Sequence, residues 1–543
     1  MDPSNFQSMK HLKLCESSSC TDLPGLDTGD LDSPDFNGVE ESGSDSEGRS
    51  DEDILTMKPV ESKVLTVDMV NEGIKVMTYA VRGPLLIRAN EIEQELKQGV
   101  EKSFKTVIKA NIGDAHAMGN KPITFIRQVM AIVTCPSLLE SEFFPEDAKL
   151  RAREILAGCR GGSVGAYSDS PGIEIIRRHV AQYITERDGG IPADWRNIML
   201  SSGASEAIRA ILKLMTNPGI VCQKKPGVMV PIPQYPLYSA TLAEYGMEKV
   251  GYYLDESKGW ALSSSELERS IREAKKRCTV RAIVVINPGN PTGQVLSRKN
   301  IESIIKFAHK EKLFLLADEV YQHNIYSPES KFYSFKKVMM EMGHPYSSLE
   351  LVSFMSCSKG YMGECGVRGG YADIINMDPD VMGMLQKSIS AKLCPPILGQ
   401  ACLDLVVHHP QPQDPSYSNW TSEVQKTLNS FAKRAEMVAN ILNGIEGMRC
   451  NVVQGAMYAF PRVMLPERAI EAAREVGQTP DVFYAFNLLE ETGVCVIPGS
   501  GFGQEPGTYH FRTTILPQES VLMDMLDRIK RFHVQFMKKF SDN

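Results

Sequence analysis

The chain has 543 residues, 42% of them apolar and 23% charged, so most of it can fold around a sizeable core. Its net charge of −8 is concentrated between Asp22 and Asp53, where twelve acidic residues and one arginine give −11 and leave about +3 for the remainder. A nearly neutral remainder without a basic stripe disfavours nucleic acid as a partner, and no apolar run approaches the roughly 20 residues of a membrane span.

Residues 1–62 are predicted to be a disordered acidic extension, because they are rich in Gly, Ser and Pro and contain few apolar side chains. Two interpretations stay open: a solvating tail, or a regulatory segment in which Ser44 and Ser46 are phosphorylated. The first residues lack a hydrophobic signal core, and the tail is too acidic for an ordinary mitochondrial transit peptide. We therefore expect a cytoplasmic rather than a mitochondrial protein.

Neither the cysteines nor the histidines indicate a metal site. The twelve cysteines show no paired CxxC spacing, which favours reduced core thiols over a disulfide framework or a zinc site. His408 and His409 are adjacent, and adjacent side chains do not converge on one ion as side chains four residues apart on a helix do. We expect no metal.

After residue 62, short apolar runs alternate with helical patterns, which is typical of an α/β fold with a mostly parallel sheet between helices. In such sheets ligands bind at the carboxyl ends of the strands, where several polar residues of this chain lie. The clearest predicted strands are Ile198–Leu200, Val228–Pro231, Ala282–Ile286, Phe314–Ala317, Leu351–Met355 and Gly370–Ile374.

The end of the first strand has two interpretations, an anion site or an ordinary serine-rich helix cap that holds no ligand. Ser201–Ser205 is a turn of small residues that leads into a helical run, and free N–H groups at Ala204 and Ser205 would point at an anion. The Ser205 hydroxyl adds a donor. Further along, Tyr235 lies between prolines, where it offers a flat surface for a ring or simply packs.

The loop Asn287–Gly293 contains Pro288 and Pro291, either of which can be cis, and holds Asn290 in a rigid turn. Asp318 follows an apolar strand, where a carboxylate is costly without a partner. That partner would be a pyridinium N–H, unless Asp318 serves as a helix N-cap. Tyr321 and Asn290 could both bond a ring hydroxyl.

Lys359 follows the strand Leu351–Met355, where partial desolvation favours the neutral amine that a Schiff base requires, unless the lysine is simply a solvated strand end. Ser356 lies three residues before it. Arg368, nine residues after it, is a cation of the type that binds phosphate with two hydrogen bonds, unless it forms a structural salt bridge. A phosphate, a ring nitrogen, a ring hydroxyl and a Schiff-base lysine together indicate pyridoxal 5'-phosphate (PLP).

The C-terminal part predicts a second, smaller α/β domain. Gly455–Pro461 and Val494–Ile497 are expected strands. A stripe at helical spacing is expected to pack in the core. It comprises Leu522, Met525, Ile529, Phe532, Phe536 and Phe540.

The order SGAS, PQYP, NPGNPTG, ADEVY, SCSKG, CGVRGGY resembles the fold-type I PLP enzymes of aminotransferase class I/II. Other stretches are similar to the alanine aminotransferases, and the resemblance spans roughly residues 64–540. These stretches are Asn111–Ala115, Pro122–Val129, Gly165–Ser168, Ser356–Tyr371 and Tyr509–Pro517.

The resemblance implies a role for each matching residue. Lys359 would carry the Schiff base and shuttle the proton, and Asp318 would hold the ring nitrogen. Arg512 would bind the substrate α-carboxylate, with Gly113 and Asn290 beside it. The remaining cofactor contacts would come from Ala204, Ser205, Tyr235, Asn290, Tyr321, Ser356 and Arg368, and from Tyr167 of the other subunit of a homodimer.

The resemblance also implies domain boundaries and a reaction. The N-terminal part of the small domain and a linker would occupy 63–130, the large PLP-binding domain 131–400, and the C-terminal part of the small domain 401–543. The implied reaction converts L-alanine and 2-oxoglutarate to pyruvate and L-glutamate, so the expected partners are small amino acids and 2-oxo acids.

Three alternatives stay open. Glutamate:glyoxylate aminotransferases would share every cofactor residue, a PLP-binding regulator would need a basic helix-turn-helix module, and a silent scaffold would be expected to lack Lys359 or Asp318. Lys359 and Arg368 stand one residue further apart than in aspartate aminotransferases, which disfavours an aspartate-specific enzyme. Arg82 is a candidate for binding the glutamate side chain, although a structural role is also open.

Overall fold

The computed structural model describes residues 65–80, 83–216, 224–541. The predicted acidic extension with Ser44 and Ser46, and the candidate Arg82, lie outside these residues. Within Leu65–Asn543, which forms one compact unit, no described helix is both long and apolar enough to cross a membrane.

The described helices are α1 (Glu72–Lys75), α2 (Pro84–Lys97), α3 (Thr124–Thr134), α4 (Glu146–Gly158), α5 (Glu174–Arg187), α6 (Ala204–Leu214), α7 (Pro236–Glu244), α8 (Ser264–Ala274), α9 (Arg298–Glu311), α10 (Phe335–Glu341), α11 (Pro379–Ser390), α12 (Ile397–Val407), α13 (Tyr417–Asn443), α14 (Glu467–Glu475), α15 (Pro480–Thr492) and α16 (Glu519–Phe540). The strands are β1 (Ile198–Ser201), β2 (Pro226–Ile232), β3 (Glu248–Tyr253), β4 (Thr279–Ile286), β5 (Phe314–Asp318), β6 (Leu351–Ser356), β7 (Gly370–Ile375), β8 (Met448–Arg449), β9 (Tyr458–Ala459), β10 (Arg462–Val463), β11 (Ile497–Pro498) and β12 (Phe511–Thr514).

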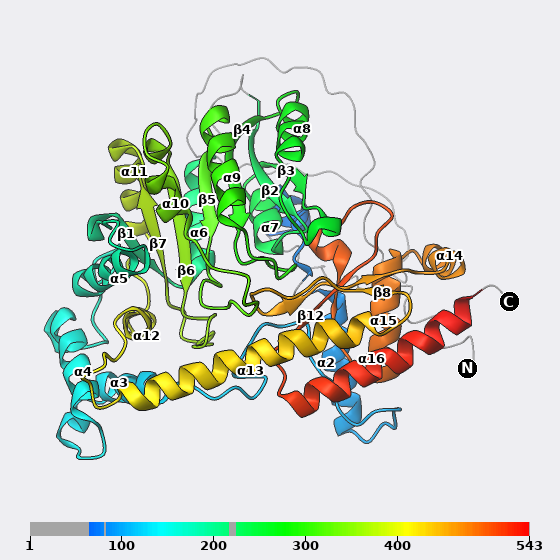
Figure 1. Cartoon of the computed structure of the whole chain (residues 1–543), viewed down its shortest axis with the longest axis horizontal. Helices are drawn as coiled ribbons and strands as arrows, with labels where there is room; N and C mark the ends of the chain where they lie inside the picture. Colours follow the sequence, from blue (N-terminus) through cyan, green and yellow to red (C-terminus); the bar gives the residue numbers. More distant parts are fainter. Residues whose placement is uncertain (1–64, 81–82, 217–223, 542–543) are drawn as a thin grey trace, which may run out of the picture. The chain divides into compact units, whose positions relative to one another are not determined.

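A seven-stranded sheet in the order β1-β7-β6-β5-β4-β2-β3 organises the large part of the fold (Figure 1). Its strands are parallel except β7, which runs antiparallel to both β1 and β6. The α/β class and all six predicted strands of this sheet are confirmed. β3, at the edge, was not predicted, because the half-buried Glu248 and the exposed Lys249 interrupt the apolar pattern.

Helices cover both faces of this sheet, because side chains along a strand alternate between the two faces. In β4, Ala282 and Val284 pack in the core that α6 and α7 cover, while Ile283 and Val285 face the core beneath α8, α9 and α10. A third core joins α3, α4, α5 and α12. Helices therefore shield both faces of the sheet from water, so the polar residues that could bind a ligand lie at the strand ends.

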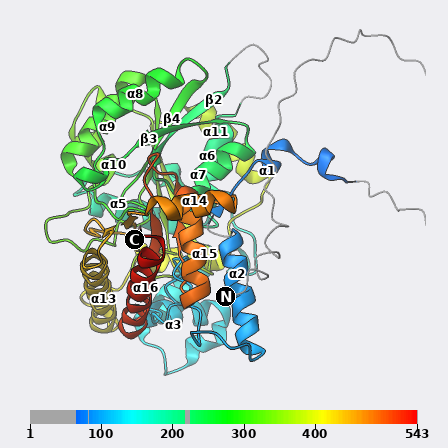
Figure 2. The same cartoon turned by 90° about the vertical axis from the view of Figure 1, so that its right-hand side faces the viewer.

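The C-terminal helices pack on one side of the seven-stranded sheet, where α13, α15, α16 and α2 lie together (Figure 2). Five of the six residues in the predicted α16 stripe are buried and Phe540 is partly buried, which confirms core packing. The predicted strands Gly455–Pro461 and Val494–Ile497 are shorter than expected. Within these two segments, only β9 and Ile497 pair regularly, both with β12. Val494 forms an isolated bridge to Ile108 instead.

Candidate active site

Strand direction brings the predicted site residues to one edge of the sheet. β4, β5 and β6 are parallel, so the loop after β4, Asp318 and Ser356 lie at the same edge. β7 runs the opposite way, and Gly370 at its start pairs with both Ser356 and Ser201. The turn after β1, the lysine loop after β6 and the arginine before β7 therefore meet at this edge.

A cradle of N–H groups and one guanidinium lies there. α6 begins at Ala204 after Gly203, whose φ is +85°. A Cβ on Gly203 would lie 2.6 Å from Nη2 of Arg368, so the close approach of this arginine requires glycine. Arg368 donates to the carbonyl oxygens of Ser202 (2.9 Å) and Cys365 (3.0 Å), and among the residues with described positions it forms no ion pair. A cation at a helix N-terminus without a carboxylate partner is suited to bind a phosphate.

Two serines lie beside the cradle. Ser205 is in the first turn of α6 and is half-buried. Ser356 is buried at the end of β6, where its hydroxyl donates to the Gly369 carbonyl (3.3 Å) and accepts from the Ser358 N–H (3.1 Å). Ser356 therefore braces the two segments that carry Lys359 and Arg368.

Asp318 is a buried carboxylate with one unsatisfied oxygen. Its Oδ2 accepts from the Tyr238 hydroxyl (2.9 Å), while the buried Oδ1 has no hydrogen-bond partner among the residues that the structure describes. Burial raises the pKa of this carboxyl from 3.8 to about 6. No helix begins after Asp318, since residues 320–323 form a turn, and the N-cap interpretation is wrong. A buried acceptor that lacks a donor fits a protonated ring nitrogen.

Lys359 lies in the loop after β6, with Nζ 3.5 Å from the Gly113 carbonyl oxygen and 5.8 Å from the ring centroid of Tyr321. The next residue, Gly360, has a φ of +69°, and its N–H donates to Oδ1 of Asn324 (2.9 Å), which fixes the loop. The charge of Lys359 partly opposes the burial that raises the pKa of Asp318. The amine and the carboxylate therefore lie within electrostatic range of each other.

Arg512 is a buried guanidinium on β12. Its Nη1 donates to Oδ1 of Asn290 (3.1 Å), and its Nη2 to the carbonyl oxygen of Asn111 (2.6 Å). Its guanidinium carbon lies 3.9 Å from the ring centroid of Tyr458, and its Nε has no hydrogen-bond partner within the described part of the chain. A fixed fork with a free donor is suited to bind a carboxylate.

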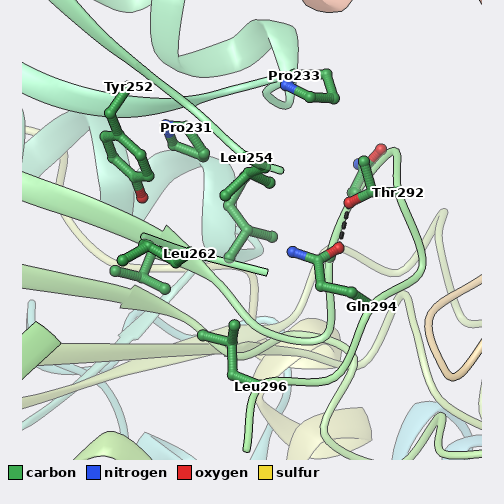
Figure 3. Close-up of a pocket in the computed structure, with 12 residues that line it drawn as sticks. Pro231, Pro233, Tyr252, Leu254, Leu262, Thr292, Gln294 and Leu296 are labelled. Atoms are coloured by element: carbon green, nitrogen blue, oxygen red, sulfur yellow. Dashed lines mark hydrogen bonds between the residues drawn. The ribbon is translucent and has the colours of Figure 1, made fainter. Parts of the chain in front are cut away.

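The loop that carries Asn290 contains two cis peptide bonds and an internal hydrogen bond. The Asn287–Pro288 and Asn290–Pro291 bonds are both cis, as the sequence allowed. Figure 3 shows the hydrogen bond from the Thr292 hydroxyl to the Gln294 side chain, beside a small pocket also lined by Tyr252 and Leu254. Asn290 also lines this pocket, so the pocket adjoins the residue that Arg512 contacts.

Two pairs of tyrosines contact each other at this site. The Tyr235 hydroxyl is 2.9 Å from that of Tyr79. Tyr321 is buried and meets Tyr458 edge to face, with ring centroids 6.2 Å apart, and burial raises the pKa of Tyr321. A Cβ on Gly113 would lie 2.0 Å from the Tyr458 hydroxyl oxygen, so residue 113 must be a glycine for its backbone to lie this close to Tyr458.

Tyr167 does not join this group. Its side chain is 65% exposed, and none of the hydrogen bonds between described residues links it to the site. The other predicted residues meet in two connected clusters, one around Arg368 and one around Lys359, Asp318 and Arg512.

The sequence did not identify Tyr238, Tyr458, Tyr79 or Asn111 as contacts of the site. Tyr238 follows Tyr235 at three residues, on the first turn of α7, and only this spacing could have drawn attention to it. Tyr458 lies in a predicted strand, but no motif marks its ring as the surface beneath Arg512.

The residues fit PLP with an amino-acid substrate. Oδ1 of Asp318 is a buried acceptor that lacks a donor, and Nε of Arg512 is a buried donor that lacks an acceptor. The protonated ring nitrogen of PLP and the carboxylate of an amino acid would satisfy them. The cradle at Gly203 and Arg368 has the donors that a phosphate needs.

Comparison with known families agrees with this chemistry. The model of aminotransferase class I and II matches residues 137–529. The chain is 57% identical over 485 residues to "Alanine aminotransferase 2-like" of Danio rerio, covering 89% of this chain and 88% of that protein. It is 56% identical over 482 residues to "Alanine aminotransferase 1" of Homo sapiens, covering 88% and 97%.

Solved structures share the fold. An alanine aminotransferase from Pyrococcus furiosus superposes with a TM-score of 0.66 at 22% identity, over 86% of this chain and 100% of that one. An aminotransferase from Escherichia coli gives the same TM-score at 21% identity, over 86% and 98%.

Proposed function

The chain belongs to the class I and II aminotransferases, and on this premise we propose that it moves an amino group between L-alanine and 2-oxoglutarate, giving pyruvate and L-glutamate. One observation carries the proposal. A lysine after β6 lies within electrostatic range of a buried, half-satisfied carboxylate at the end of the adjacent strand β5, beside a guanidinium fork.

The cofactor of this family is PLP, which when bound supplies an electron sink for breaking the α C–H bond of an amino acid. We assign its contacts from the residues at the sheet edge. The phosphate would be bound by the N–H groups of Ala204 and Ser205, the Ser205 hydroxyl, Arg368 and Ser356, the ring nitrogen by Asp318, the ring oxygen by Asn290 and Tyr321, and the ring face by Tyr235.

Lys359 would hold the cofactor through its amine. When this amine is free and neutral, it would act as the base that takes the α-proton of the substrate and as the acid that gives the proton back. Two contacts limit the position of the Lys359 amine. The Gly113 carbonyl oxygen lies 3.5 Å from Nζ, and the Asn324–Gly360 hydrogen bond fixes the loop that carries the lysine.

Asp318 would hold a proton on the ring nitrogen. Its carboxyl is costly to ionise without a cation, since burial raises its pKa to about 6. A pyridinium N–H at Oδ1 offsets that cost, and Tyr238 orients the carboxylate by bonding Oδ2.

Arg512 would bind the α-carboxylate of either substrate with two parallel hydrogen bonds. Asn290 and Asn111 hold the guanidinium in place, and the Tyr458 ring supports its face. Because alanine and 2-oxoglutarate share this carboxylate, one arginine serves both half-reactions.

The substrates are amino acids and 2-oxo acids. We extend the proposal to a cytoplasmic homodimer with shared active sites, in which Tyr167 of each subunit reaches the phosphate of the other. The exposure of Tyr167 and its absence from the described site of its own chain support this arrangement. We also propose the domain division 63–130, 131–400 and 401–543.

The test uses the PLP-loaded protein with L-alanine and no 2-oxo acid. We expect the visible spectrum to change and about one equivalent of pyruvate to form per site. Lys359→Ala should abolish both, while the exposed Lys433→Ala and the substrate D-alanine serve as matched controls. An unchanged spectrum with no pyruvate from the wild type would refute the proposal.

The same preparation separates the glyoxylate alternative. With L-glutamate as donor, an alanine-type enzyme should react faster with pyruvate than with glyoxylate. The reverse preference would identify a glutamate:glyoxylate aminotransferase with the same cofactor site.

A further inference from the structure

Three metal-ligating side chains converge at the C-terminal end of α12, outside the site described above. His179 comes from α5, and Asp404 and His408 stand four residues apart in the last turn of α12 and at its C-cap. Each residue offers one ligand atom, and these atoms all lie within 4.8 Å of one another. His408 thus converges with Asp404, one helical turn earlier, rather than with its neighbour His409.

The hydrogen bonds within this cluster leave two atoms unused. Nδ1 of His179 lies 2.7 Å from Oδ1 of Asp404. The Asp404 side chain is 1% exposed, yet no described residue forms a hydrogen bond with its Oδ2 or with the buried Nδ1 of His408. Buried polar atoms are nearly always satisfied, so two in one cluster indicate a missing ligand.

We propose that His179, Asp404 and His408 bind one divalent transition-metal ion, with Zn²⁺ as the probe and water as a fourth ligand. Two imidazoles and a carboxylate are a ligand set that Zn²⁺ accepts. Zinc bonds of about 2.0–2.1 Å hold ligand atoms roughly 3.4 Å apart, so side-chain rotation must draw the most distant pair closer. The partial negative charge at the C-terminus of α12 also favours a cation.

Arg151 on α4 competes with the ion. Its Nη1 lies 2.8 Å from Nε2 of His408 and donates to it, so the proton of the neutral imidazole is on Nδ1. Coordination through Nδ1 moves that proton to Nε2 and turns Arg151 away, toward Glu154, with which it already forms an ion pair of 2.9 Å. The arginine contact and the metal therefore exclude each other.

The bound ion would join α5 to α12, because His179 lies on α5 and Asp404 and His408 lie at the C-terminal end of α12. The first turn of α12 supports the anion cradle, because a Cβ on Gly369 would lie 2.1 Å from the Gly399 carbonyl oxygen.

The experiment titrates chelator-treated, PLP-loaded protein with Zn²⁺ by calorimetry. We expect one ion per chain, at least tenfold weaker binding in His179→Gln and in His408→Gln, and tighter binding in Arg151→Leu. His409→Gln is the matched control, because His409 stacks on Trp420 with ring centroids 4.3 Å apart and lies outside the cluster. Circular dichroism and PLP content verify that each variant is folded.

Co²⁺ gives an independent reading in the wild type, where four-coordinate nitrogen and oxygen ligands produce intense d–d bands without a thiolate charge-transfer band. The proposal is overturned if the wild type shows no saturable Zn²⁺ binding, or if both histidine variants bind as the wild type does. It is also overturned if Arg151→Leu binds no more tightly, or if Co²⁺ shows thiolate ligation from a cysteine.

Discussion

Replacing Asp318 with asparagine should stabilise the cofactor-free protein at neutral pH while it removes most of the transaminase activity. The folded carboxyl has a pKa of about 6 against 3.8 in the unfolded chain, so the folded state binds more protons between these values. The stability of the wild type therefore falls as pH rises through this window. Asparagine does not ionise, so the variant should lose this contribution to the pH dependence of stability.

The magnitude follows from the two pKa values. Ionising Asp318 costs the folded wild type about 1 kcal/mol near pH 4.5 and about 3 kcal/mol near pH 8, the full value of a shift of about two pKa units. The amide oxygen of the asparagine can still accept from Tyr238. Its NH₂ group, at the former position of Oδ1, changes the free energy of unfolding by an amount that does not depend on pH. The predicted quantity is therefore the slope of the stability difference with pH.

Urea unfolding of both cofactor-free proteins between pH 4.5 and 8 measures this slope, and turnover of alanine by the PLP-loaded forms should fall by on the order of 10²-fold or more. Glu319→Gln is the matched control for activity. Glu319 is the adjacent buried carboxyl, but it bonds Ser353 and the Phe335 N–H, so its replacement should leave turnover within a few-fold. A stability difference that is constant across this pH range would refute the reasoning.

Three further outcomes follow from the contacts. Arg512→Lys should lower kcat/KM for both alanine and 2-oxoglutarate by roughly 10–100-fold, because an ammonium cannot form two parallel bonds; steady-state kinetics with each substrate measures this, and a loss confined to one substrate would contradict it. Gly113→Ala should lower activity because its Cβ would lie 2.0 Å from the Tyr458 hydroxyl oxygen, and Tyr458→Phe should restore part of the loss in the double variant; additive losses in that double-mutant cycle would argue against the clash. Tyr167→Phe should weaken PLP retention on dialysis if this tyrosine reaches the partner's phosphate, whereas unchanged retention would count against shared sites.

Much of the fold is decided locally. Apolar runs in β1, β2 and β4–β7 are long enough to be recognised, since strands buried on both faces need apolar side chains at every position. β3 at the sheet edge carries charged residues and was missed for that reason. β9 and β11 proved shorter than predicted, because pairing partners far away in the chain decide where a short strand ends.

From the sequence alone, Lys359, Asp318 and Arg368 could be predicted as cofactor-binding residues, because each lies close to the end or the start of an apolar strand. Only the tertiary structure showed that Tyr238 bonds Asp318 and that Tyr458 lies beneath Arg512. It also showed that His408 meets His179 and Asp404 rather than His409. Local pattern fixes which residue types stand at a strand or helix end, whereas contacts between distant segments depend on how the sheet and helices pack.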